Sequence, residues 1–350
     1  MSEIACHLGN TTSSLERLNV STFLTSQVPS ECYFSKWPFV FRMMQKVDSM
    51  KFGRVMFRNE VHRETFIEMI NALGLTPPVV IKPNWGFSVI FTEAEILDWT
   101  LSAIDGEAYV VESYGWARCR EAVEEKKYGS YGLDALRQAD KWFLHYSGID
   151  KVLKKHDVEY LNITEEVWAG RVVEHETISS IVEDAYSPLF MRFLASSVPQ
   201  RLYDLSDGSL LSLSKLKFMS DDIVISLSLK NLFGMIPGPD RGLFHGEENR
   251  AMSRSIVDVN KIYRSLFKTK GVVEGVLTAS RGMTLEPQVF RNCGVLWTCE
   301  DLLELDAVVT SHVGLNPREV GYLNLAAQSF GEWDDEPVSL AKKHVLPQFS

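Results

Sequence analysis

Lysine and amide side chains that could hold a small anion follow the apolar run of residues 79–81. Lys82 and Asn84 stand directly after this run, on either side of a proline. In open α/β sheets, ligands lie beyond the carboxyl ends of the strands, so both side chains would face a ligand there. Lysine supplies a point charge and asparagine supplies an amide donor. The alternative is a lysine that reaches out of a strand end into solvent, and this segment alone does not decide between the two.

A second pair of lysines, Lys215 and Lys217, lies at the end of the apolar segment 209–218. Because they are two residues apart, they would share one face of a strand. Like charges so close together are costly on a buried face unless an anion lies between them. On a solvated edge strand, the same lysines would oppose aggregation, and the segment taken alone favours this simpler interpretation.

A third segment joins a predicted strand at 223–229 to a loop rich in glycine and proline at 234–242. Its candidate side chains are Ser226, Ser228, Lys230, Asn231 and His245. Alternation along a strand would place the two serines and Lys230 on one face. Long loops of this composition often carry function, although an ordinary surface strand and loop explain the pattern equally well.

Two carboxylates interrupt apolar stretches, Glu112 within 108–114 and Asp306 within 305–309. A buried carboxylate needs a partner, so Glu112 either pairs with one of the lysines or lines the site. The pattern around Asp306 slightly favours a helix N-cap. Both could balance the lysines or bind a divalent metal.

The elements that would position these residues alternate between strand and helix. Strands are predicted at 53–57, 78–82, 108–114, 158–163, 209–218, 223–229 and 271–278. Helices are predicted at 63–73, 92–104, 133–156, 251–267, 303–313 and 318–330. Thr92 with Glu95 forms a capping-box pattern, and Thr164 is read as a further cap. This order predicts an α/β fold with a mainly parallel or mixed sheet and helices on both faces.

The predicted organisation is an irregular N-terminal extension, one large domain and a tail. The extension covers 1–50, the α/β domain covers 51–331, and a surface tail covers 332–350. As an alternative, the α/β domain divides into two lobes with a break near 165–205.

Composition excludes several classes of protein. Among the 350 residues, 36 Lys and Arg stand against 46 Asp and Glu, a net charge of −10, which argues against a nucleic-acid partner. No apolar stretch of about 18 residues exists, and no secretory leader is recognisable, so we expect a cytoplasmic protein with no membrane partner. The five cysteines are scattered, without iron–sulfur spacing. The glycine patterns of Rossmann and P-loop nucleotide sites are absent, as is the H-E-x-x-H zinc motif.

Taken together, five motifs resemble the family catalogued as domain of unknown function 362, over roughly residues 78–331. They are VVIKPNW, KLK, SLKNLFGMIPG with a following His, SIVDVN, and LDAV with VGLNPREVGYL. The resemblance implies an α/β fold and, for some members, a role in small-molecule biosynthesis. Some members carry a ferredoxin-like segment that is missing here, and the cofactor stays unknown. The family usually continues KLK with Thr-His, where this chain has Phe218 and Met219, so either its chemistry differs from that of the family or His245 supplies the imidazole.

These observations favour an enzyme that acts on a small anionic carboxylate or phosphate at a lysine-rich site. The expected catalytic residues are Lys82, Lys215, Lys230 and His245. The expected substrate-binding residues are Asn84, Lys217, Ser226, Ser228, Asn231, Glu112 and Asp306. One lysine, desolvated beside the others, could act as a base or as a Schiff-base nucleophile.

Two other classes of function stay open. Cys293 and Cys299, with His312 or His245, would hold a metal in a redox or metal-dependent protein, although their spacing is unusual. A non-catalytic ligand-binding or scaffold protein would instead show an exposed apolar patch, for which Trp37 and its aromatic neighbours are the candidates.

Overall fold

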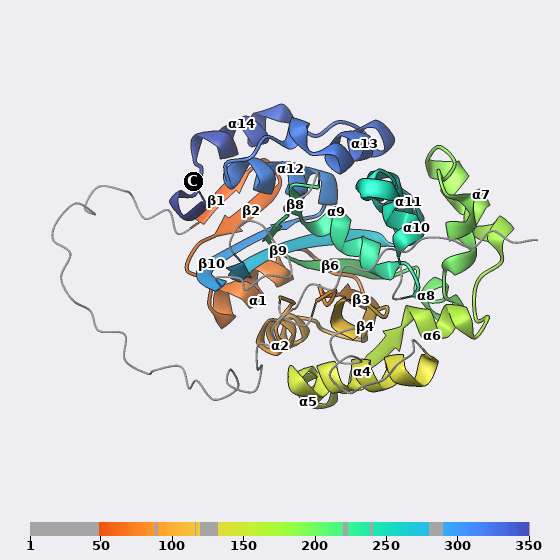
Figure 1. Ribbon diagram of the computed structural model, residues 1–350. Helices are drawn as coiled ribbons and strands as arrows, with labels where there is room; N and C mark the ends of the chain where they lie inside the picture. The colour runs from red at the N-terminus through yellow and green to blue at the C-terminus, as the bar shows by residue number, and fades with distance from the viewer. Residues whose placement is uncertain are drawn as a thin grey trace, which may run out of the picture. The chain divides into compact units, whose positions relative to one another are not determined.

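Parallel and antiparallel strands form one mixed sheet in the computed structural model (Figure 1). The structure describes residues 49–87, 90–115, 117–119, 132–219, 223–238, 241–279 and 290–349. The predicted extension, including Trp37, lies outside these residues apart from its last two positions. The compact unit that contains all described residues runs from Val47 to Ser350.

Within the described residues, the sheet has eight strands in the order β1-β2-β10-β9-β6-β3-β4-β5. Their bounds are β1 (Ser49–Phe52), β2 (Val55–Arg58), β3 (Val79–Lys82), β4 (Ala108–Glu112), β5 (Glu159–Asn162), β6 (Ser209–Lys215), β9 (Lys268–Ala279) and β10 (Phe290–Cys299). The five strands from β9 to β5 are mutually parallel, whereas β10, β2 and β1 continue the sheet antiparallel. A separate ladder pairs β7 (Lys217–Phe218) with β8 (Ile225–Ser226).

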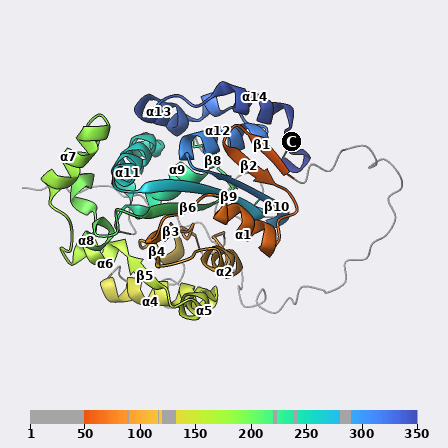
Figure 2. The same cartoon turned by 180° about the vertical axis from the view of Figure 1, so that it is seen from behind.

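Helices cover both faces of the sheet (Figures 1 and 2). They are α1 (Arg63–Asn71), α2 (Ala94–Ser102), α4 (Leu133–Tyr146), α5 (Ile149–Lys155), α6 (Ile163–Trp168), α7 (His175–Ala185), α8 (Gln200–Tyr203), α9 (Ser228–Asn231), α10 (Gly242–His245), α11 (Met252–Leu266), α12 (Leu302–His312), α13 (Gly321–Phe330) and α14 (Asp335–Lys343). Short 3-10 helices are η2 (Arg192–Ser197), η3 (Leu232–Met235), η4 (Glu247–Asn249), η5 (Pro317–Glu319) and η6 (Pro347–Phe349). The prediction of an α/β fold is confirmed.

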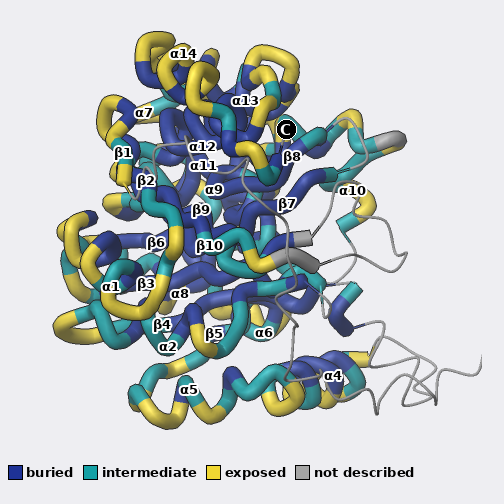
Figure 3. The backbone as a smooth tube through the Cα atoms, turned by 90° about the vertical axis from the view of Figure 1, so that its left-hand side faces the viewer, coloured by how far each residue is buried: buried dark blue, intermediate teal, exposed yellow. Residues whose placement is uncertain are grey.

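Strand β3 shows why the sheet is covered on both sides. Val80 belongs to the buried cluster that includes residues of α11 and α12, whereas Val79 and Ile81 belong to the one that includes residues of α1 and α2, as expected from alternation along a strand. A strand between two helical layers is apolar throughout, which explains the VVI sequence. The tube in Figure 3 is accordingly buried along most of β3, β6 and β9.

The chain changes direction across the sheet between β3 and β6. From β3 it proceeds outward to β4 and β5, and then it returns to the other side of β3 to form β6 and β9. Neighbouring parallel strands whose connections leave in opposite directions define a topological switch point, where ligands of open α/β sheets bind. The carboxyl ends of β3 and β6 are therefore the place to look for a site.

The predicted strand at 223–229 is wrong beyond residue 226. Only Ile225 and Ser226 are strand, and α9 begins at Ser228. The cause is Asp306 of α12, which accepts the backbone N–H groups of Ser228 and Leu229, each at 2.9 Å. These are the first donors of a helix, so a carboxylate from elsewhere in the chain caps α9.

Three local capping predictions are also wrong. Asp306 lies inside α12, whose N-cap is Asp301. Helix α2 begins at Ala94, and the Thr92 hydroxyl instead accepts the N–H of Asn84 at 2.9 Å. Helix α6 is capped by Asn162 rather than Thr164. Asp301 and Asn162 cap α12 and α6, and the Thr92 hydroxyl is engaged in a tertiary hydrogen bond instead of a cap.

The C-terminal stretch after residue 331 contains a packed helix. In α14, Val338 and Ala341 are buried, and the helix contacts α12 and β1. Within the described part of the chain, no helix combines the length and the apolar composition needed to cross a membrane.

Replacing Asp306 with alanine should destabilise the protein by about 2–4 kcal/mol, because two buried N–H donors of α9 lose their acceptor. Asp334→Ala is the matched control, since Asp334 caps the exposed start of α14 and its loss should cost about 1 kcal/mol. Urea unfolding measures both. Equal losses in the two variants would contradict the role of Asp306.

Candidate functional site

Side chains from β3, β4 and α9 meet at the switch point around Lys82. Its Nζ lies 2.8 Å from Glu112 Oε2 and donates to the Pro83 carbonyl, also at 2.8 Å. The lysine and Glu112 side chains are only 1% and 2% exposed. Burial lowers the pKa of Lys82, and the charge of Glu112 opposes that shift. Of the two alternatives for Glu112, pairing with a lysine is therefore the one observed.

Glu112 is held in place by the backbone as well as by Lys82. It accepts the N–H groups of Trp85 at 3.3 Å and Ser113 at 3.0 Å. A buried ion pair is tolerable only when further hydrogen bonds satisfy its remaining atoms, and here they do.

Gly234 of η3 closes over this ion pair. A Cβ at this position would lie 2.5 Å from Lys82 Nζ and 2.8 Å from Glu112 Oε1. Only glycine lets the backbone come so close, which explains the glycine in the segment LFGM.

A chain of amides connects the ion pair to Lys217. Asn231 Nδ2 donates to the Lys82 carbonyl at 2.8 Å and to Ser212 Oγ at 3.2 Å. Asn84 Nδ2 donates to Asn231 Oδ1 at 2.9 Å, and Lys217 Nζ donates to Asn84 Oδ1 at 2.6 Å. Because the Lys82 carbonyl can only accept, each amide has one allowed orientation. The chain therefore always presents an acceptor to Lys217.

Among the described residues, Lys217 differs from Lys82 in having no carboxylate partner. Its side chain is buried, and among the described residues no carboxylate lies within ion-pair distance of Nζ. Its pKa is lowered well below the usual value by burial and by the positive charges of Lys230, Lys82 and Lys215, while Glu112 acts in the opposite direction. The four predicted lysines thus lie close enough to influence one another.

Lys215 is neutralised by carboxylates that sequence analysis did not single out. Its Nζ lies 2.7 Å from Glu274 Oε1 and 2.9 Å from Glu93 Oε2, and it donates to the Leu277 carbonyl at 2.8 Å. The two carboxylates raise the pKa of Lys215 against the effect of burial, and burial raises the pKa of Glu274 to about 7. A lone glutamate in the strand GVVEGV was the available signal for this partner.

Comparison with protein-family models shows the family of the chain. Residues 79–311, which include the whole lysine cluster, match the model described as Domain of unknown function (DUF362). The chain belongs to the DUF362 family. No curated protein and no solved structure matches it.

Two cationic side chains, Lys230 and Arg241, lie over the ring of Phe233 beside this DUF362 site. Lys230 Nζ lies 5.9 Å from its ring centroid and Arg241 Cζ lies 5.7 Å from it. The His245 ring packs edge-on against Phe233 at 5.2 Å, and its Nδ1 is 2.9 Å from Asn249 Oδ1. Lys230 and His245 are half-buried, so they border the cluster rather than forming its centre.

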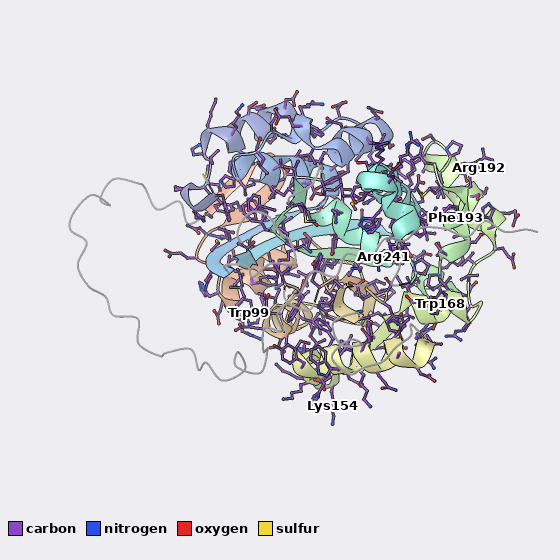
Figure 4. All side chains as sticks on the ribbon, viewed as in Figure 1. Trp99, Lys154, Trp168, Arg192, Phe193 and Arg241 are labelled. Atoms are coloured by element: carbon purple, nitrogen blue, oxygen red, sulfur yellow. The ribbon has the colours of Figure 1, made fainter. Side chains whose placement is uncertain are left out.

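Arg241 is a further cation that sequence reasoning missed (Figure 4). It donates to Ser113 Oγ, and it reaches the carbonyls of Ile236 at 3.3 Å and Tyr114 at 3.4 Å. Burial lowers its pKa. Its position in a loop rich in glycine and proline, beside the KNLFG motif, was the only signal for it.

Three predicted site residues remain, and they are Ser226, Ser228 and Asp306. Ser226 stands opposite Lys217 in the β7–β8 ladder. Ser228 and Asp306 hold the start of α9, where the Ser228 hydroxyl donates to Asp306 Oδ1 at 2.5 Å. Met219, in the place where the family usually has histidine, is half-buried and packs against the core.

The residues considered for a metal are engaged otherwise. Among the residues that the structure describes, no group of three or more His, Cys, Asp and Glu could hold a metal ion. Trp297 Nε1 donates to His312 Nδ1 at 3.0 Å, and burial lowers the pKa of this histidine to about 4. Cys299 is buried, and its Sγ accepts the N–H of Asp301 at 3.4 Å.

Two cavities lined by described residues lie away from the lysines. One, of about 360 Å³, lies between Arg54 and Trp333, and the other, of about 490 Å³, lies between α7 and Arg192. Neither is lined by a predicted site residue.

Removing Lys82 should destabilise the protein far more than removing Lys217. Lys82→Met leaves Glu112 buried without its counter-charge, which should cost about 3–5 kcal/mol. Lys217→Met removes a buried amine that has no carboxylate partner among the described residues and leaves only the neutral Asn84 Oδ1 without its donor, so the loss should be no more than about 1–2 kcal/mol. Thermal and urea unfolding measure both. A large loss in Lys217→Met would show that this lysine has a structural role.

Replacing Gly234 with alanine should destabilise the protein by about 1–3 kcal/mol, because the methyl group overlaps the Lys82–Glu112 pair. Gly86→Ala is the control within the same site, since a Cβ at Gly86 meets nothing within 4 Å. If the two variants unfold at the same urea concentration, the close approach of η3 to the ion pair does not constrain the site.

Proposed function

We propose that this DUF362 chain is an enzyme acting on a small anionic molecule, a carboxylate or phosphate, bound beside Lys217 at the switch point between β3 and β6. The observation that carries the proposal is the buried Lys217 amine, which faces an amide oxygen and has no carboxylate partner among the described residues. A bound anion would provide the missing negative charge.

The charges around Lys217 support an anionic ligand. Lys82 and Lys215 are each paired with glutamate, whereas Lys217 feels the positive charge of both lysines and of Lys230. Positive charge in a poorly hydrated site is attractive to anions, and it stabilises negative charge that develops during a reaction. The net charge of −10 does not oppose this, since short-range fields dominate inside a buried site.

The neighbouring side chains have complementary roles in this proposal. Asn84 and Asn231, fixed by their hydrogen-bond chain, orient the ligand. Lys230 borders the site on the Phe233 side, and His245 on the same side serves as the proton carrier. A place in small-molecule biosynthesis and a cytoplasmic location remain part of the proposal.

Small anions should bind the wild-type protein and should bind Lys217→Met at least tenfold more weakly. Calorimetric titration with inorganic phosphate and with oxalate measures this. Because the pKa of Lys217 is lowered in the free protein and an anion raises it, binding near neutral pH should take up a proton, seen as a heat that depends on the buffer. Lys154→Met, which removes an exposed lysine of α5, is the control and should bind normally.

Unchanged binding by Lys217→Met, or no binding of either anion by the wild type, would refute the proposed site. To separate an enzyme from a binding protein, anionic metabolites that bind are incubated with the protein and examined by NMR. Binding without conversion of any of them would favour the non-catalytic alternative.

A further inference from the structure

We propose that Lys217 is a catalytic amine that forms an imine with its substrate, so that the substrate is an anion carrying a carbonyl group, such as a 2-oxo carboxylate. This inference rests on the proposed function, because it names the chemistry of the same site.

Hydrogen bonding around Lys217 suits a neutral amine. The amide chain from Asn231 through Asn84 presents one acceptor, and a neutral amine fills it with one N–H while keeping its lone pair. An ammonium group carries three donors and would leave two of them buried with no acceptor among the described residues. Lys82 has two acceptors and Lys215 has three, and each set includes a carboxylate, so the surroundings of those two lysines suit an ammonium group better than those of Lys217 do.

The charged groups around Lys217 come from four neighbouring elements. Lys82 of β3, Lys215 of β6 and Lys230 of α9 all disfavour a fourth positive charge, and Glu112 of β4 only partly offsets them. Desolvation beside other cations is a standard way to obtain a nucleophilic lysine near neutral pH.

The position of Lys217 also separates it from bulk water. Its side chain is buried, and Nζ lies 5.5 Å from the centroid of the Phe87 ring. Burial in a low dielectric disfavours the charged amine, an effect that the face of the Phe87 ring partly offsets, and it strengthens the attraction to an anion once the imine is charged.

The chemical step balances without a cofactor. The Lys217 lone pair attacks the carbonyl carbon, so a C–N bond forms, the C=O π bond breaks and the oxygen takes a proton. Loss of this hydroxyl with a further proton releases one water and leaves a protonated C=N bond. The cationic imine then withdraws electrons from the adjacent carbon, and the carboxylate beside it keeps the group in the positive cluster.

Reductive trapping with glyoxylate, a small anionic aldehyde, tests this directly. The full-length protein is incubated with glyoxylate and sodium cyanoborohydride at pH 7, and the labelled lysines are located by peptide mass spectrometry. Lys217 should be labelled at least tenfold faster than the exposed Lys154, and inorganic phosphate should slow its labelling. Labelling of Lys154 with none at Lys217 would overturn the proposal.

Two variants separate a reactive amine from an accidental one. Lys217→Arg removes the amine nucleophile and should give no labelling at this position. Lys230→Met removes the first of the charges that lower the pKa of Lys217, so its labelling should need a higher pH than in the wild type. An unchanged pH profile would contradict the charge coupling that makes this lysine reactive.

The failure of this inference can be distinguished from the failure of the proposed function. If phosphate and oxalate bind and depend on Lys217 but no imine is trapped there, the anion site stands and the imine is excluded. If neither anion binds, the proposed function and the inference fall together.

Discussion

The cost of burying lysine charge governs the whole site. Removing an ammonium group from water costs several kcal/mol unless an anion and further hydrogen bonds compensate. This chain compensates at two of its lysines, where Lys82 meets Glu112 and Lys215 meets Glu274. Each pair joins two neighbouring parallel strands, β3 with β4 and β6 with β9, so the ion pairs form only when the sheet brings these strands together. Lys217 has no carboxylate partner among the described residues, and burial and the neighbouring lysines lower its pKa.

A second buried carboxylate, Asp306, determines which residues reach the site. By capping α9 from inside α12, it turns the segment after β8 into a helix instead of a longer strand. That helix brings Asn231 across to β3 and lets Gly234 settle on the ion pair. Local helix propensity plays little part, because four residues are too few to form a stable helix alone.

The switch point explains why polar residues gather where they do. Parallel strands end at the same edge, and the connections after β3 and β6 leave in opposite directions, so the polar residues at these two strand ends lie next to each other. The family match covers this region from β3 to α12. The fold and family membership are therefore established together, while the reaction is a proposal.

The sequence by itself located many of the elements, the family resemblance and the segments that carry the candidate site. Apolar periodicity located β3, α1 and α11 because burial on a helix or strand face follows local spacing. Only the tertiary structure decided the state of each lysine, since its partners are remote: Glu112 lies 30 residues from Lys82, and Glu93 lies 122 residues from Lys215. The strand predicted over 223–229 failed for the same reason, because Asp306, which caps α9 at Ser228, lies 78 residues away from it. Charge pairing and capping join residues that are far apart in the sequence, so sequence patterns do not show which distant carboxylate pairs with a given lysine or caps a given helix.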